Sequence, residues 1–168
     1  MSGIRDLRDF LEILKENKLL FEVEKEVDWN HEIGSLLATM EAEGQKTGLF
    51  HKVKDKGFPV CGNVLASMDG IALALGCKKN EMTDFLAECL EHPIKPHVVE
   101  DAPCHENVLT GDQVDMGLLP VPIHAPKDGG PIITGGVIVS KEIDGPRQNL
   151  SFQAYACERK RQVQHHDQ

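Results

Sequence analysis

The sequence lacks the features that mark membrane-spanning, exported and nucleic-acid-binding proteins. No stretch of about 18 apolar residues occurs, so the sequence predicts no membrane span. The first ten residues are charged and lead into an amphipathic segment, unlike a secretory signal peptide. A formal net charge of −9 disfavours nucleic acid and anionic membranes as partners, because their phosphates would be repelled.

The cysteines offer no disulfide framework. They number five and contain no CxxC pair, a pattern typical of reduced cytosolic thiols, so we expect a cytoplasmic protein. The 168 residues suit one domain, or one domain and part of a second. With 40% hydrophobic and 27% charged residues, the composition is compatible with a globular core.

The first part of the chain shows mixed helical and extended patterns. Leu7, Phe10, Leu11 and Leu14 fall on one face of a helix that Asn17 would end. Further expected elements are strands at Leu19–Val23, Leu49–Val53 and Phe58–Val64, and helices from near Asn30 to Gly44, over Ile71–Leu75 and from Asn80 to Leu90. These elements predict an α/β, or α+β, N-terminal domain over residues 1–115.

Proline-rich sequence separates this part from the rest. Seven prolines between residues 93 and 131 predict a domain boundary followed by a long ordered crossing. Ile132–Lys141 and Gln148–Ala156 are then expected as two strands joined through Asp144-Gly145. Residues 116–157 would form the second unit. Residues 158–168 are polar and without period, which predicts a disordered tail.

Three polar residues of the expected hairpin are candidate ligands. Thr134 opens the first strand, while Asn149 and Ser151 lie two apart on the second and therefore share a face. Their oxygen atoms suit a hard cation together with a phosphate. The alternative is the polar outer face of a half-exposed hairpin.

Other possible sites are weaker. The pairs Gly129-Gly130 and Gly135-Gly136 would let the backbone approach a phosphate, or else form tight turns that bracket a strand. The histidines show no metal-ligand spacing, and the adjacent pair His165-His166 is typical of a solvated tail. No catalytic residue is predicted.

Four segments in order resemble one enzyme family. They are LRDFLEILKENKLL at the start, PVCGN at Pro59–Asn63, LLPVPIHAPKDGGPIITGGVIVS at Leu118–Ser140 and RQNLSF at Arg147–Phe152. Together they resemble the N-terminal part of UbiD-type decarboxylases over residues 4–153. The resemblance implies that the second unit is the first hairpin of a split β-barrel flavin-binding domain.

The resemblance also implies a chemistry. Family members decarboxylate aromatic or α,β-unsaturated acids with prenylated FMN, and with Mn²⁺ and K⁺ at the cofactor. Thr134, Asn149 and Ser151 match the family's cofactor-binding positions, Asn149 matches a metal ligand, and a main-chain oxygen near Leu150 would meet K⁺. The cofactor acts as the electron sink for loss of CO₂.

The sequence departs from the family pattern in two ways. Ala154 stands where the family has an Arg that binds flavin and the substrate carboxylate. The other metal ligands and the acid–base residues lie further along in the family. A frameshift near codon 153 would explain the tail, since a shifted frame can be written that resembles the family; a native ending or a gene-assembly boundary are the alternatives.

Two functions follow as expectations. The first is an N-terminal part of a carboxy-lyase, inactive by itself, with a hairpin that is marginally stable and prone to associate. The second is a non-catalytic accessory module that pairs with a longer decarboxylase chain by strand addition. A homo-oligomer is a further expected assembly.

Overall fold

The computed structural model describes residues 4–44, 46–145, 147–159 and 162–165. The chain forms two compact units, each assembled from three separated segments. The first unit contains the residues up to Val23 together with Leu37–Leu49 and Cys61–Thr110. The second contains Glu24–Leu36, Phe50–Val60 and the residues from Gly111 onward. The boundary expected at residue 115 is therefore replaced by an interleaved arrangement, in which two early segments join the later unit.

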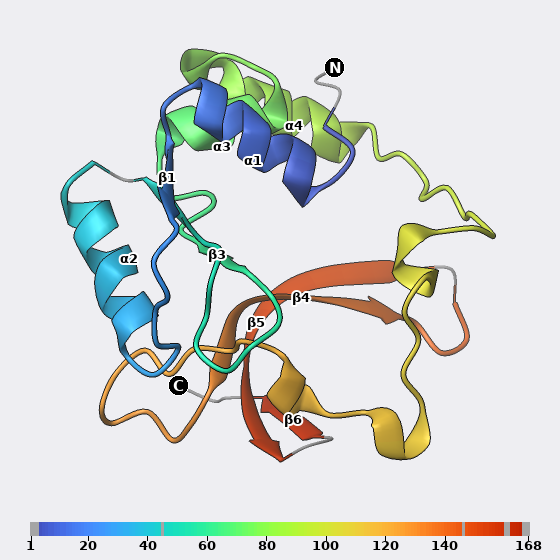
Figure 1. The fold of residues 1–168 in the computed structure, drawn as a ribbon. Coiled ribbons are helices and arrows are strands. Elements are labelled where there is room, and N and C mark those ends of the chain that lie inside the picture. The colour runs from blue at the N-terminus through green and yellow to red at the C-terminus, as the bar shows by residue number, and fades with distance from the viewer. Residues whose placement is uncertain (1–3, 45, 146, 160–161, 166–168) are drawn as a thin grey trace. The chain divides into compact units, whose positions relative to one another are not determined.

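Helices dominate the first unit. They are α1 (Leu7–Glu16), α3 (Met68–Leu75) and α4 (Met82–Glu91), and α1 contacts α3 (Figure 1). The Ser67 hydroxyl accepts from the N–H of Gly70 and caps the start of α3, while Gly76 ends it with a φ of 69°. A short 3₁₀ helix over Lys79–Glu81 precedes α4, so α4 begins at Met82 and not at the expected Asn80.

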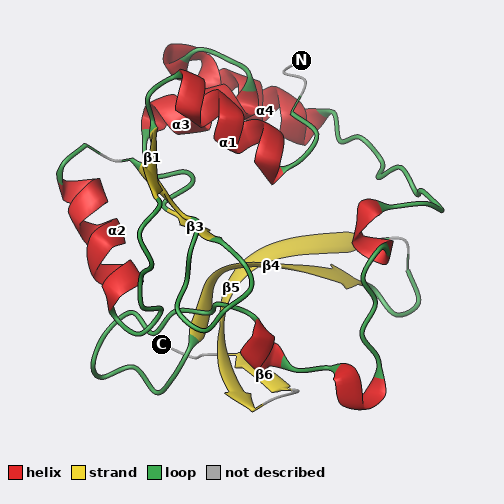
Figure 2. Ribbon diagram, viewed as in Figure 1, coloured by secondary structure: helices red, strands yellow, loops and turns green. Residues whose placement is uncertain are grey.

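A small three-stranded sheet has the order β1-β2-β3. Its strands are β1 (Leu20–Val23), β2 (Thr47–Phe50) and β3 (Val60–Gly62), coloured yellow in Figure 2. Helix α2 (Glu32–Ala42) lies between β1 and β2 in sequence. These elements confirm the expected ones to within a few residues at each end, which is the usual scatter of helix and strand limits.

A second sheet has the order β4-β5-β6 and carries the candidate residues (Figure 2). Strand β4 (Ile132–Lys141) pairs antiparallel with β5 (Gln148–Arg159), which pairs in turn with β6 (Gln162–His165). The N–H of Glu142 donates to the carbonyl of Arg147 at 3.0 Å and closes the loop between β4 and β5. The predicted hairpin is confirmed.

The disorder predicted for residues 158–168 is wrong where the structure describes them. Strand β5 continues to Arg159, and β6 aligns His165 with Tyr155 and Gln162 with Arg159. Strand pairing joins backbone N–H and C=O groups, which a search for side-chain periodicity does not detect. The remaining tail residues lie outside the described part.

Each unit has its own buried apolar residues. In the first these include Phe10, Leu14, Ala72 and Met82, and in the second Val27, Ile33, Phe50, Val53 and Ile132. No helix of the described ranges has both the length and the apolar character needed to cross a bilayer.

Candidate functional site

The hairpin β4–β5 places two of the three candidate ligands on one face. Asn149 lies opposite Ser140, and Ser151 lies opposite Ile138. Side chains two apart on a strand point the same way, so Asn149 and Ser151 share a face, as the sequence predicts. Asn149 is exposed and Ser151 is half-buried. The face therefore offers oxygen atoms that a ligand can reach.

Thr134 is positioned by a β-bulge. Ile133 pairs with Tyr155, whereas Gly136 pairs with Gln153, so Thr134 and Gly135 together stand opposite Ala154. The exposed Thr134 side chain is thus set by the bulge and not by regular alternation. The register brings Thr134 beside Ala154, the position where the family pattern has an Arg.

The pair Gly135-Gly136 belongs to this bulge. The reading of the pair as a tight turn outside the strand is wrong, because both glycines lie within β4. A Cβ at Gly136 would stand 3.1 Å from the main-chain carbonyl oxygen of Gln153, a tight contact that favours glycine at this position of the strand. A Cβ at Gly135 would meet nothing within 4 Å, so the backbone there is open to a ligand.

The face of the hairpin that carries Asn149 and Ser151 is called the ligand face below. Two further polar residues, Gln153 and Tyr155, extend it. The side-chain amide nitrogen of Gln153 donates to the Ser151 hydroxyl at 3.2 Å. The Tyr155 hydroxyl donates to the side-chain amide oxygen (Oε1) of Gln153 at 3.1 Å. This polar row fixes the Ser151 side chain. The sequence analysis missed it, although polar residues at 151, 153 and 155 follow the strand period of two.

Leu150 points to the opposite face, where it stands opposite Val139 and is 68% exposed. Its side chain is therefore not part of the oxygen-bearing face. The expected contact of a main-chain oxygen near Leu150 with K⁺ stays a prediction.

The remaining titratable residues do not gather into a second site. Within the described ranges, no group of three or more His, Cys, Asp or Glu side chains is placed to hold a metal ion. Burial raises the pKa of the Cys61 and Cys157 thiols, which disfavours the reactive thiolate at neutral pH. The side chains of His165 and His166 lie outside the described part.

The second unit also contains an open groove of about 420 Å³. The Lys56 ammonium lies 5.0 Å from the centre of the Trp29 ring and donates to the carbonyl of Gly117. Cys157 of β5 lines the groove as well. Thr134, Asn149 and Ser151 are not among the lining residues, so this groove is separate from the ligand face.

The chemistry of the ligand face suits a hard cation and a phosphate group. Exposed hydroxyl and amide oxygens suit a hard cation, and the open backbone at Gly135 suits a phosphate. One amide ligand does not complete the coordination of a divalent cation, which takes six or more ligands as a rule.

Comparison with known proteins identifies the family of the chain. The family model of the 3-octaprenyl-4-hydroxybenzoate carboxy-lyase N-terminal domain matches residues 11–90. The Rift-related domain of the same carboxy-lyase matches residues 97–167. The two matches together cover most of the chain and point to one protein family.

Individual relatives agree. A protein from Rhodospirillum rubrum, described as an uncharacterized protein in the cooM 5′ region, is 30% identical over 90% of this chain and 33% of its own length. An evolved dimeric form of HmfF from Pelotomaculum thermopropionicum, solved with prFMN, is 27% identical and superposes with a TM-score of 0.90 over 98% of this chain and 39% of that one.

A third relative is the vanillic acid decarboxylase of Sedimentibacter hydroxybenzoicus in its open form. It is 30% identical, with a TM-score of 0.84 over 96% of this chain and 36% of that one. The chain thus belongs to the UbiD family and corresponds to its N-terminal portion. It spans about a third of the length of these relatives.

Proposed function

We propose that this chain is the N-terminal part of a carboxy-lyase that decarboxylates an aromatic or α,β-unsaturated acid with prenylated FMN. The observation that carries the proposal is the hairpin face, where Asn149 and Ser151 lie together beside the bulge at Thr134. The family matches over residues 11–90 and 97–167 support it. The chain by itself is proposed to be inactive.

Each of the three candidate residues has a proposed role. Asn149 gives its amide oxygen to Mn²⁺, while Thr134 and Ser151 donate hydroxyl protons to the flavin phosphate. The Ser151 oxygen accepts from Gln153, so its own proton would remain available to donate to the phosphate. When bound, the cofactor supplies an electron sink for the loss of CO₂.

Ala154 supplies no positive charge to the proposed site. A methyl group beside Thr134 cannot neutralise a substrate carboxylate or a flavin phosphate, as a guanidinium does with two parallel hydrogen bonds. The site also needs a general acid, which none of the assigned residues supplies.

A chimera tests the proposal. Residues 4–154 would replace the matching segment of the S. hydroxybenzoicus vanillic acid decarboxylase, and CO₂ release from vanillate would be measured with the chimera loaded with prenylated FMN. We expect activity, with Ala154→Arg raising it. We expect Asn149→Ala to lower kcat/KM by about 10- to 100-fold through weaker metal binding.

Gln148→Ala is the matched control, because Gln148 is exposed and adjacent to Asn149 but points to the other face. Its activity should equal that of the parent chimera. A chimera that folds and binds flavin, yet responds equally to both substitutions, would refute the assignment of the face.

The second candidate function is a non-catalytic subunit that pairs with a longer decarboxylase chain. The unpaired outer edge of β4 favours it, since β5 is the one strand that pairs with β4 among the described residues. Size-exclusion chromatography separates the two: a stable complex with a longer chain supports the subunit, and a clean monomer counts against it.

The frameshift hypothesis has its own test. The nucleotide sequence from codon 145 onward would be read in the shifted frame. An Arg codon at the position of Ala154, followed by further metal and acid–base residues, would support the frameshift, and a shifted frame without them would reject it.

A further inference from the structure

The open groove of about 420 Å³ in the second unit has the composition of a small-molecule site. Pockets that bind small molecules hold about 300–1,000 Å³ and combine apolar walls with a few polar groups. The apolar lining residues of this groove include Trp29, Met116, Leu118, Leu119 and Val121. The charged residues that line it are Lys56 and Asp115. One cation and one anion thus lie in a mainly apolar surface.

Main-chain hydrogen bonds hold opposite parts of the groove in place. The N–H of Ile123 donates to the carbonyl of Trp29 at 3.1 Å, which ties the indole-bearing loop to the later part of the chain. The N–H of Cys157 donates to the carbonyl of Pro131 at 2.9 Å. A groove that is formed before binding lowers the conformational entropy that a ligand must overcome.

The ammonium of Lys56 is the positive charge of the groove. It lies 5.0 Å from the centre of the Trp29 ring and donates to the carbonyl of Gly117. Both partners are uncharged, so these two contacts do not cancel the charge of the ammonium. An ammonium group has three N–H donors, and the bond to Gly117 uses one of them. This half-buried cation therefore favours a negatively charged ligand.

Asp115 limits how much negative charge the groove accepts. Its carboxylate accepts from the N–H of Gly117 at 2.8 Å, at the start of the 3₁₀ turn Met116–Leu118. Because like charges repel, this carboxylate disfavours a ligand with two negative charges, such as a phosphate monoester. A single carboxylate group meets the attraction of Lys56 with less of that repulsion. The two charged residues together favour a monoanion.

The apolar walls indicate the rest of the ligand. Leu118 and Leu119 are 49% and 40% exposed, and Trp29 is half-buried. Covering these side chains removes apolar surface from water, which favours binding. A flat ring also packs well against an indole, by offset stacking or edge to face. Since the Lys56 ammonium lies over the Trp29 ring, a carboxylate bound to Lys56 would bring its ring close to the indole.

We propose that this groove binds a small monocarboxylic acid with a flat apolar body. The Lys56 ammonium donates to the carboxylate, and the apolar body lies against Trp29, Leu118 and Leu119. The groove is separate from the ligand face of the hairpin, so the inference does not rest on the proposed function.

Tryptophan fluorescence tests the site directly, because Trp29 is the only tryptophan of the 168 residues. The full chain, without flavin or metal, would be titrated with sodium benzoate at constant ionic strength. We expect a saturable change of emission with a midpoint of about 1 mM or below, the range of a ligand with few atoms. Benzamide has a similar shape without the charge, and its midpoint should be at least about tenfold higher. Inorganic phosphate should leave the emission unchanged.

Two substitutions with opposite expected effects separate charge recognition from a structural role. Lys56→Gln should raise the benzoate midpoint by at least about tenfold, and Lys56→Arg should keep it within about threefold. Asp115→Asn should lower the midpoint by about two- to fivefold, because it removes the like charge and keeps an oxygen that accepts from Gly117.

Lys52→Gln is the matched control. Lys52 is an exposed lysine four residues before Lys56, and it does not line the groove. Its removal lowers the net positive charge of the same loop by the same amount, so the benzoate midpoint should stay unchanged. The far-ultraviolet circular dichroism of each variant shows whether the fold is retained.

Three results would overturn the proposal. They are an emission change that does not saturate, equal midpoints for benzoate and benzamide, and a folded Lys56→Gln variant that binds benzoate as the wild type does. If Lys56→Gln does not fold, Asp115→Asn decides, and a midpoint that stays the same or rises there would reject the site. An active chimera combined with no benzoate binding in the groove would reject this inference and leave the proposed function standing.

Discussion

The N-terminal helices and the β4–β5 hairpin use similar apolar residues in opposite ways. Helix α1 buries Phe10 and Leu14, whose exposed fractions are 6% and 1%. The hairpin leaves Phe152 78% exposed, although Phe152 sits in an equally regular pattern. Periodicity thus shows that an element has an apolar side. It does not show what covers that side.

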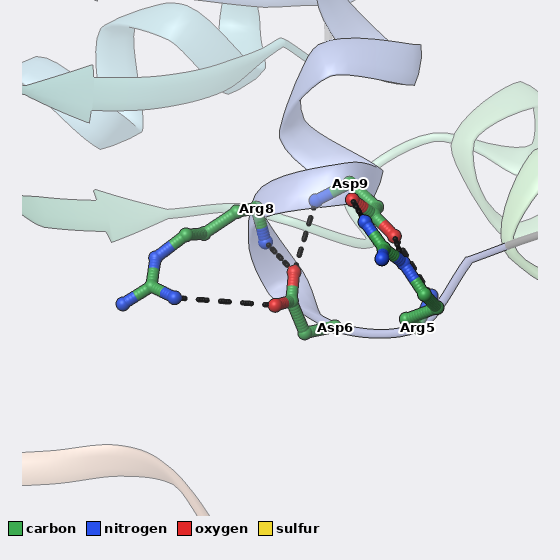
Figure 3. A network of polar contacts seen from close by, with 4 residues as sticks. All are labelled: Arg5, Asp6, Arg8 and Asp9. Carbon is green, nitrogen blue, oxygen red and sulfur yellow. Dashed lines mark hydrogen bonds and ion pairs between the residues drawn. The ribbon is translucent and has the colours of Figure 1, made fainter. Parts of the chain in front are cut away.

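Polar contacts also differ between the two regions. Helix α1 is tied at its start by local contacts: the Asp6 carboxylate accepts from the N–H groups of Arg8 and Asp9 at 2.8 and 3.1 Å, and Arg5 pairs with Asp9 (Figure 3). The side-chain contacts of the hairpin instead lie along its ligand face, at Ser151, Gln153 and Tyr155. The helix forms its polar contacts within its first turn, whereas the hairpin aligns its polar side chains along one face of β5.

The largest expected contrast is between two phenylalanines. Phe50 is fully buried, so Phe50→Ala should lower the free energy of unfolding by about 3–5 kcal/mol through lost contacts and a cavity. Phe152→Ala removes an exposed ring and should change it by no more than about 0.5 kcal/mol. Urea unfolding followed by circular dichroism measures both. Equal losses would mean that Phe152 is covered in the free chain.

Packing inside the first unit gives the next effect. A Cβ at Gly62 would collide with the Leu37 side chain, so Gly62→Ala should cost about 1–3 kcal/mol. Gly57→Ala is the control, since a Cβ there meets nothing within 4 Å. Thermal unfolding would compare them. If Gly62→Ala leaves the stability unchanged, the Leu37 side chain has room to move. The packing around Gly62 would then be as loose as that of the hairpin.

The cap of α1 is expected to contribute less. Asp6→Ala removes the acceptor for two backbone N–H groups and should cost about 1 kcal/mol. Glu12→Ala, at an exposed position within the helix, should be nearly neutral. Amide hydrogen exchange of the first turn would follow the fraying directly, and unchanged protection in Asp6→Ala would contradict the capping role.

The smallest expected effect depends on pH. The N–H of Asn30 and then the Lys54 ammonium hold the pKa of Asp28 below its ordinary value. A lowered pKa in the folded state stabilises the fold above the unfolded pKa of about 4, and that contribution disappears as the pH falls through the folded value. At pH 7, the wild-type protein should therefore reach its unfolding midpoint at a higher urea concentration than Asp28→Asn. The difference between the two midpoints should become smaller toward pH 3. A constant difference would contradict the linkage.

Much of the candidate site could be predicted. Asn149 and Ser151 lie two apart in a strand, which places them on one face in any register. The position of Thr134 could not be predicted, because the bulge that sets it depends on the pairing of Ile133 and Gly136 with β5. The strand β6 was missed for the same reason, since backbone pairing leaves no mark on side-chain pattern.

The sequence by itself determined the helices and strands of the first part, the hairpin, the placement of Asn149 and Ser151 on one of its faces, and the family. These depend on local propensity, capping and short-range alternation, which neighbouring residues carry. Only the tertiary structure decided that Glu24–Leu36 and Phe50–Val60 join the later unit, and that Val137, Val139, Leu150 and Phe152 stay exposed. Such outcomes depend on contacts between residues distant in sequence, where each segment finds its partner by shape and by backbone hydrogen bonding.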